Sequence, residues 1–163
     1  MAKKIITITL YMSELIYDVQ NKTYLTGMSR KDGSNDEYVA HMQNNDDEEH
    51  SNQVLRTIGS AFASLKGRLG EYLVDSATTG DNEQIPKTGT LVVSLNMPSN
   101  YNPAENDAVS AAMHQYIVNM AVGDWFTITN KADAGDYYQF AANNLGQLRE
   151  AINRRVRPTR VQI

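Results

Sequence analysis

Histidine and carboxylate side chains gather between residues 41 and 50, a combination that can bind a metal ion. His41 and His50 flank the acidic run 46–49, and His50 follows Asp46 by four residues, which places both on one face of a helix. A zinc or other transition-metal site needs further ligands, and no second group of ligands is evident elsewhere in the sequence. Carboxylates are also favoured in the first turn of a helix by its positive N-terminus. We therefore interpret the cluster as a solvated helix start and predict no metal site.

The other candidate catalytic residues match no known signature. His114 lies between Met113 and Gln115 on a predicted helix, which indicates a partly buried or interface side chain. The segment GSAFASLKG (59–67) lacks the spacing of a phosphate loop, and the chain has no cysteine. No Ser-His-Asp pattern is found. We predict that the chain is not an enzyme and uses no cofactor, with a hydrolase assembled from scattered polar residues as the alternative.

Arginine is concentrated at the C-terminal end of the sequence. Five arginines and one glutamate give residues 149–163 a net charge of +4 in a chain of net charge −4, so residues 1–148 carry −8. An acidic body opposes long-range attraction to phosphate, which argues against a globally basic nucleic-acid-binding protein but allows a local basic arm. Arg149, Arg154 and Arg155 are explained by the last predicted helix, where cations in the final turn favour the free carbonyl groups.

The remaining two arginines, Arg157 and Arg160, bracket Pro158, which ends the helix and favours extended backbone before it. A segment of this kind can add a strand to the edge of a partner's sheet, with its arginines paired to carboxylates or phosphates. A frayed terminus is the alternative. We predict that these residues bind a partner: Arg154, Arg155, Arg157, Arg160, Val161 and Ile163.

Apolar periodicity predicts an α+β, mainly α fold in a single domain, residues 1–156, followed by an extended basic C-terminal arm, residues 157–163. Residues 3–12 and 90–98 are predicted strands, and we expect them to form a small two-stranded sheet because a lone strand leaves its backbone groups unsatisfied. Apolar positions spaced by three and four residues predict four principal helices, at about 14–30, from the acidic run 46–49 to about 73, at 104–126 and at 137–156.

Several residues predict where the helices begin and end. Ser13 is a plausible N-cap for the first helix. The segment TNKADAGD (129–136) predicts a break between the last two helices, with Asp133 and Asp136 as cap and turn residues beside Gly135. The segments TITLYM (7–12) and VVSLNM (92–97) share a pattern that indicates either two duplicated β-α-α halves or two unrelated amphipathic strands.

Two further groups of residues indicate packing. Trp125 and Phe126 are expected in the core, with a contact patch for a partner as the alternative. Glycine inside a helix costs up to about 1 kcal/mol relative to alanine, so glycines there indicate close helix–helix approach, within or between subunits, unless they are simply tolerated. Five glycines fall inside predicted helices: Gly59, Gly67, Gly70, Gly123 and Gly146.

The N-terminal segment MAKKIITITLYMSELIYD has two lysines before apolar residues, as a signal peptide does. However, Thr7, Thr9, Ser13 and Glu14 interrupt the apolar run, and no small-residue cleavage site follows. No window approaches the roughly 20 apolar residues of a membrane span. We expect a protein that is made and used in the cytoplasm and has no membrane partner.

Four segments together resemble a group of small virion proteins from tailed phages and prophages of Bacteroidales hosts, including crAss-like phages. The resemblance covers most of the chain and depends on whole segments, without a diagnostic motif. The segments are LYMSELIYDVQNKTYLTGMSR, NNDDEEHSNQVLRTIGSAF, DWFTITNKADAGDYYQFAANNL and LREAINRRVRP.

This resemblance implies a head–tail connector or neck protein of the virion, assembled in the host cytoplasm as a homo-oligomeric, twelve-fold ring below the portal. The arginines would then contact an acidic portal surface or an adjacent tail or neck protein, or face DNA in the channel, and the acidic body would not grip passing DNA. No single residue role is carried over, and paired strands are not a general connector feature. A DNA-binding or packaging accessory protein that uses the arginine-rich C-terminus is the alternative.

Overall fold

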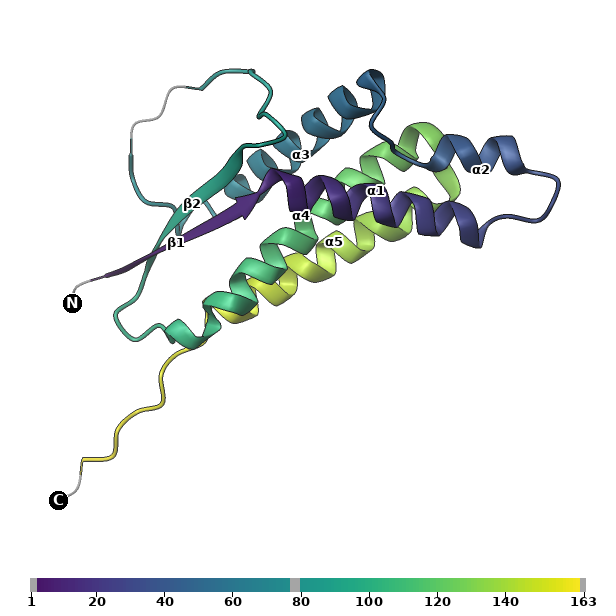
Figure 1. Cartoon of the computed structure of the whole chain (residues 1–163). Coiled ribbons are helices and arrows are strands. Elements are labelled where there is room, and N and C mark those ends of the chain that lie inside the picture. The colour runs from purple at the N-terminus through teal and green to yellow at the C-terminus, as the bar shows by residue number, and fades with distance from the viewer. Residues whose placement is uncertain (1–2, 77–79, 162–163) are drawn as a thin grey trace.

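The computed structural model describes residues 3–76 and 80–161 and confirms the predicted α+β, mainly α class (Figure 1). A two-stranded sheet of β1 (Lys4–Tyr11) and β2 (Thr90–Met97) lies against the helices. The seven-residue helix α2 and the 3-10 turn η1 were not predicted. The helical elements are α1 (Met12–Ser29), α2 (Asp36–Met42), α3 (Glu48–Arg68), η1 (Pro103–Glu105), α4 (Asn106–Thr129) and α5 (Lys131–Ile152).

The two strands pair antiparallel, as expected, with Lys4 opposite Met97 and Tyr11 opposite Thr90. Apolar residues alternate along β1, so Ile6, Ile8 and Leu10 face the core while their neighbours are exposed. The pairing thus buries one face of the sheet and leaves the other in solvent.

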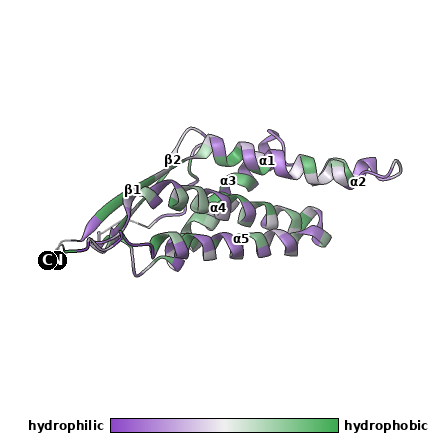
Figure 2. Ribbon diagram, turned by 90° about the horizontal axis from the view of Figure 1, so that it is seen from below, coloured by the Kyte–Doolittle hydropathy of each residue, from purple (hydrophilic) through white to green (hydrophobic). Residues whose placement is uncertain are grey.

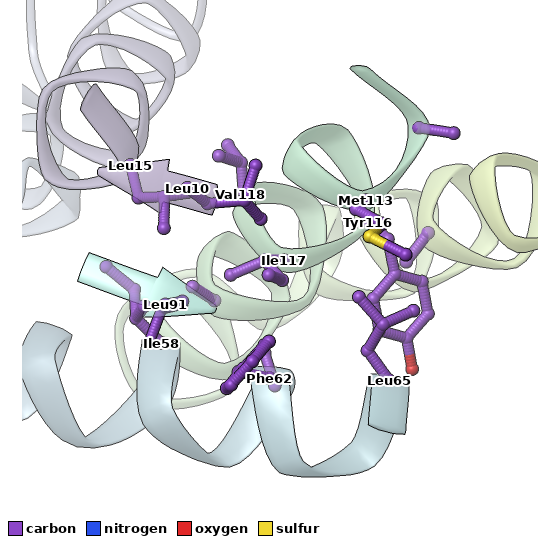
Figure 3. Close-up of a cluster of buried hydrophobic side chains, with 14 of the residues drawn as sticks. Leu10, Leu15, Ile58, Phe62, Leu65, Leu91, Met113, Tyr116, Ile117 and Val118 are labelled. Atoms are coloured by element: carbon purple, nitrogen blue, oxygen red, sulfur yellow. The ribbon is translucent and has the colours of Figure 1, made fainter. Parts of the chain in front are cut away.

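Helix α4 is the centre of the fold. It packs lengthwise along α5 and also contacts α3 and α1, and its consecutive residues 116–119 are all buried, so no face of this helix is free along that stretch. Figure 3 shows Ile117 and Val118 of α4 near Leu10 of β1, with Phe62 of α3 on the other side. The core therefore joins the buried face of the sheet to three helices.

Two helix starts differ from the sequence prediction. Helix α1 begins at Met12, directly after β1, so Ser13 is its second residue and is not the N-cap. The N–H of Met12 donates to the carbonyl of Gly89, 3.1 Å away, which ties this strand–helix junction to the start of β2. The predicted break 129–136 shrinks to Asn130, because α5 begins at Lys131.

Two helix ends come earlier than predicted. Helix α3 ends at Arg68, and Leu73 instead bridges Leu95 of β2. Helix α5 ends at Ile152, and the exposed residue Val156 donates its N–H to the carbonyl of Asn100, 2.9 Å away. In both places backbone pairing with a segment distant in sequence replaces the last predicted helical turn.

The aromatic residues expected in the core are buried there. Phe126 has no exposed surface, and the indole N–H of Trp125 donates to the carbonyl of Met42 at 2.7 Å. Figure 2 shows how hydrophobic residues alternate with hydrophilic ones along the helices. None of the helices in residues 3–76 and 80–161 combines the length and the apolar run that a membrane crossing requires.

Only one of the five helical glycines marks a close approach between helices. A Cβ at Gly123 would lie 2.8 Å from Cε1 of Tyr138, so α4 and α5 touch here through the missing side chain. A Cβ at Gly59, Gly67 or Gly146 would meet no heavy atom within 4 Å, and Gly70 lies beyond the end of α3. The close-approach interpretation is confirmed for Gly123 alone.

Candidate functional site

The C-terminal segment is anchored to the fold just after α5. The N–H of Asn102 donates to the carbonyl of Arg154 at 3.3 Å, and Tyr101 and Arg155 form an antiparallel bridge. Tyr101 is fully buried, and its hydroxyl donates to Oδ1 of Asn106 at 2.9 Å. The chain therefore leaves the body at a fixed point, beside the loop that follows β2.

The first two arginines of the segment are occupied within the chain. Nη2 of Arg154 donates to Oε1 of Glu150 at 3.0 Å, and its Nε lies 3.9 Å from Oε1 of Glu105. Nη1 of Arg155 donates to the carbonyl of Ile152 at 2.9 Å, which satisfies an end carbonyl of α5. The prediction that both lie in the last turn of that helix is wrong, because the helix has ended before them.

The next residues of the segment are exposed and extend away from the body (Figure 1). Val161 is 86% exposed. Within the described residues, neither Arg157 nor Arg160 has a hydrogen bond or ion pair. Ile163, the last predicted partner-binding residue, lies outside the described residues. The structure therefore separates two occupied arginines from two that the rest of the described chain does not use.

Two lysines join the arginines at this end of the molecule, although the sequence separates them by about 150 residues. Lys4 begins β1 opposite Met97, and its Nζ donates to the carbonyl of Tyr101 at 3.3 Å. Lys3 precedes it and is exposed. We call this group the basic end: Lys3, Lys4, Arg154, Arg155, Arg157 and Arg160. The register of the two strands creates it, so sequence reasoning found only the arginines.

A second surface of opposite charge lies at the far end of β1. There β1, α1 and α4 surround a hollow of about 360 Å³. Glu14 and Asp18 of α1 and Asp107 of α4 line it, together with His114, whose Nε2 lies 2.5 Å from Oδ2 of Asp18. No lysine or arginine is among its described lining residues. We call this surface the acidic hollow.

A row of polar contacts joins α1 to α4 and α5, and sequence reasoning missed it. From Asp18 to Arg30, the residue that directly follows α1, every fourth residue points a polar group at another helix, a spacing that follows one helix face and is visible in the sequence. Burial lowers the pKa of Lys22, while the nearby Asp18 carboxylate raises it. The pairs are Asp18 with His114, Lys22 with Gln115 and Asn119, Thr26 with Tyr137, and Arg30 with Asp133.

The last pair of this row corrects a prediction. The sequence predicts a cap or turn role for Asp133, but this residue is buried in the first turn of α5 and forms a two-point ion pair with Arg30. The hydrogen bond from Arg30 lowers the pKa of Asp133 against the opposing effect of burial, and the side-chain amide of Asn130 adds a second donor at 2.6 Å. The contact joins the end of α1 to the start of α5 and belongs to the fold.

The histidine and carboxylate cluster begins α3, with Asp47 at the N-cap position and Glu48 and Glu49 in the first turn. His50 accepts a hydrogen bond at Nδ1 from the N–H of Asn45, and its ring packs edge-on against Trp125 at 4.8 Å between centroids. Across residues 3–76 and 80–161 no three His, Cys, Asp or Glu side chains are grouped so as to hold a metal ion.

Comparison of the chain with models of protein families, with curated proteins and with solved structures gives no match. The features of the molecule that bear on function are its two charged surfaces and the segment that leaves the basic end.

Proposed function

We propose that the chain is a structural virion protein of a tailed phage, which forms a homo-oligomeric connector ring between the portal and the tail. The observation that carries this proposal is the exposed C-terminal segment, whose Arg157 and Arg160 have no partner within the described chain. Two cations without a partner in the described chain, on a segment that is anchored to the body, do not stabilise the fold. They do suit an attachment point for an acidic surface of another protein.

The rest of the surface also supports assembly. Large apolar side chains are exposed on β1, α1 and α4, among them Ile5 (63%), Tyr17 (64%) and Ile128 (65%). Aromatic and aliphatic side chains of this kind are common in the centres of subunit interfaces. The acidic body and the basic end give one chain two complementary surfaces, so neighbouring copies attract each other when the basic end of one meets the body of the next.

In this proposal the protein acts by position and by contact. The helices around α4 form a rigid scaffold, and the C-terminal segment attaches that scaffold to a neighbour. The resemblance to connector proteins adds the setting, a twelve-fold ring below the portal. A net charge of −8 over residues 1–148 would repel DNA in the central channel and so limit friction during its passage.

Native mass spectrometry of the purified chain, with and without the portal protein encoded in the same genome, tests the proposal. We expect a closed oligomer of defined copy number that binds portal rings. A chain that ends at Val156 should lose assembly while keeping its fold. A strictly monomeric full-length chain that does not bind portal protein would overturn the proposal.

One observation favours a second candidate, a DNA-binding or packaging accessory protein. Arg157, Arg160 and Lys3 are exposed cations at one end of the molecule and can contact phosphates. Binding through phosphate contacts weakens steeply with salt, because each contact releases a condensed counterion. Titration of duplex DNA at several salt concentrations separates the two candidates: a connector should bind DNA weakly at low salt and not at all near physiological ionic strength.

A further inference from the structure

Strand β1 has one side that is open for pairing. On β2, the carbonyl of Ser94 accepts from Val74 and the N–H of Asn96 donates to the carbonyl of Tyr72, so both residues point away from β1. In an antiparallel pair, two directly opposite residues either both direct their backbone N–H and C=O groups toward each other or both direct them away from each other. Thr7 and Ile5, opposite Ser94 and Asn96, therefore direct their N–H and C=O groups outward.

Alternation extends this outward row to Thr9 and Tyr11, and all four residues are exposed. The outer edge of β2 is covered by residues 72–74, but within the described residues no segment covers the edge of β1. An uncovered edge strand is a template for another extended chain. The fold thus presents one free strand edge.

The acidic hollow lies at the end of that edge. Thr9 and Tyr11 belong both to the outward row and to the lining of the hollow. Glu14 and Asp107 are exposed there, whereas Asp18 is engaged with His114. An extended chain that paired with the second half of β1 would run beside these carboxylates, so cations are the side chains that suit it.

The C-terminal segment of the same sequence has the complementary properties. If it runs antiparallel to β1 with Thr159 opposite Thr9, residues 157, 159 and 161 turn their backbone groups toward the strand. Pro158 then faces away, where its missing N–H costs no ladder hydrogen bond. Arg157 falls opposite Tyr11, whose ring is 59% exposed and can pack against a guanidinium group. Arg160 falls on the face of the sheet that packs against α4, the helix that carries Asp107.

A chain cannot make this contact with its own arginines. Its segment is fixed at Val156, next to Tyr101, and Tyr101 is in contact with Lys4 at the start of β1. The antiparallel register places Arg157 opposite Tyr11, but Arg157 directly follows Val156, so its Cα lies within about 3.8 Å of the Cα of Val156. Tyr11 is about 23 Å away, because it lies seven residues along β1 from Lys4. The segment would also have to run parallel to β1.

We propose that residues 157–161 of one copy add a strand to β1 of a second copy, with Arg157 and Arg160 beside the acidic hollow. This inference rests on the proposed ring, and it specifies the contact between neighbouring subunits of that ring. Each copy gives one segment and receives one, so the contact is head-to-tail, the kind that produces rings when the rotation closes. The occupant of the β1 edge is thus another copy of this chain and not the portal.

Two charge-reversed variants test the pairing by mass measurement in solution. Arg157→Glu/Arg160→Glu removes the donor half and keeps the hollow, while Glu14→Lys/Asp107→Lys does the reverse. We expect each alone to self-associate at least about tenfold more weakly than the natural chain, since like charges then face each other. Mixed one to one, they should assemble again into oligomers in which the two variants alternate, because the arginines of one meet the carboxylates of the other and the introduced glutamates meet the introduced lysines. This recovery also shows that both variants are folded.

Lys31→Glu/Lys131→Glu is the matched control, because it makes the same charge change at exposed residues beside the Arg30–Asp133 pair, at the end of α1 opposite the acidic hollow, and should leave the ring intact. Rings that persist in Arg157→Glu/Arg160→Glu would overturn this inference and leave the proposed function standing, all the more so if portal binding is lost. A mixture that stays monomeric would also overturn the pairing. A natural chain that is monomeric and ignores portal protein would overturn both.

A crosslinking experiment tests the register directly, because the chain has no cysteine of its own. Thr9→Cys/Thr159→Cys should give disulfide-linked multimers on mild oxidation, since directly opposite residues of paired strands bring their Cβ atoms to about 4.5–5.5 Å. Thr88→Cys/Thr159→Cys should remain uncrosslinked as the control. Linkage confined within single chains, or equal linkage in both variants, would contradict the proposed contact.

Discussion

Helix α4 is packed against the rest of the chain, whereas the C-terminal segment is exposed along its whole described length. Almost every turn of α4 is held by contacts with other parts of the same chain, and twelve of its residues are buried. From Asn153 to Val161, by contrast, every described residue is exposed, and the anchoring contacts end at Val156. The difference indicates that stability and assembly reside in separate parts of the molecule. Each can then be changed without the other.

The largest expected effect is the loss of an aromatic ring from α4. Phe126→Ala should lower the free energy of unfolding by about 3–5 kcal/mol, because Phe126 is fully buried and its removal leaves a cavity. Phe140→Ala on α5 is the matched control, since that ring is 49% exposed and should cost less than about 1 kcal/mol. Urea unfolding measures both. Equal losses would show that α4 is not the centre of the core.

The Arg30–Asp133 pair should give the next largest effect. Asp133→Asn keeps the size of the side chain but replaces the carboxylate that accepts from Arg30 and Asn130. A buried polar group that loses a charged partner costs about 1–3 kcal/mol. Thermal unfolding at neutral pH checks this value, and Asp136→Asn, at an exposed position three residues on, is the control. A neutral Asp133→Asn would mean that burial of the carboxylate cancels the benefit of its partners.

The Arg30–Asp133 pair also predicts that the stability of the fold decreases at low pH. The pKa of Asp133 in the folded chain is lowered from its ordinary value of 3.8, so the folded state binds this proton less readily than the unfolded state. Its contribution is therefore complete above that pH and is lost as the pH falls through the folded pKa. Unfolding measured from pH 6 to pH 2 should show a loss that is smaller in Asp133→Asn. Parallel curves would contradict the assignment.

Two glycines on the packed helices should respond in opposite directions. Gly123→Ala forces a methyl group against the Tyr138 ring, whose hydroxyl donates to Oδ1 of Asp124 at 2.6 Å and so resists displacement. The overpacking cost exceeds the helix propensity gained, for a net loss of about 1 kcal/mol. Gly146→Ala meets open space and should gain up to about 1 kcal/mol. A gain at both positions would mean that α4 and α5 adjust freely.

Much of the body could be predicted from the sequence because its signals are local. Alternation in 4–11 and spacings of three and four in 54–65 indicate the strand and the helix without knowledge of their neighbours. Errors arose where distant backbone decided the outcome: Leu73 pairs with Leu95, and Val156 pairs with Asn100. Periodicity cannot anticipate a helix that ends because another segment offers hydrogen bonds.

Of the candidate site, only the arginines of the basic end could be predicted from the sequence. The arginines are adjacent in sequence, so their concentration was evident, and Pro158 indicated where the helix could not continue. The acidic hollow joins Glu14 and Asp107, which are 93 residues apart, and the open edge of β1 depends on which strand side residues 72–74 cover. The acidic hollow and the open edge therefore depend on how the elements are arranged in the fold. The sequence shows which residues are charged but not which of them lie together.

The smallest expected change in stability belongs to the C-terminal segment. A chain that ends at Val156 keeps the Tyr101–Arg155 bridge and the Asn100 contact, so it should unfold within about 0.5 kcal/mol of the full chain. Both chains must be compared at a concentration where they are monomeric, since assembly itself stabilises the folded state. A chain that ends at Ile152 loses those hydrogen bonds and should cost about 1–2 kcal/mol. If removal of residues 157–163 alone destabilised the monomer as much, the segment would be packing against its own subunit, and the separation of stability from assembly would be wrong.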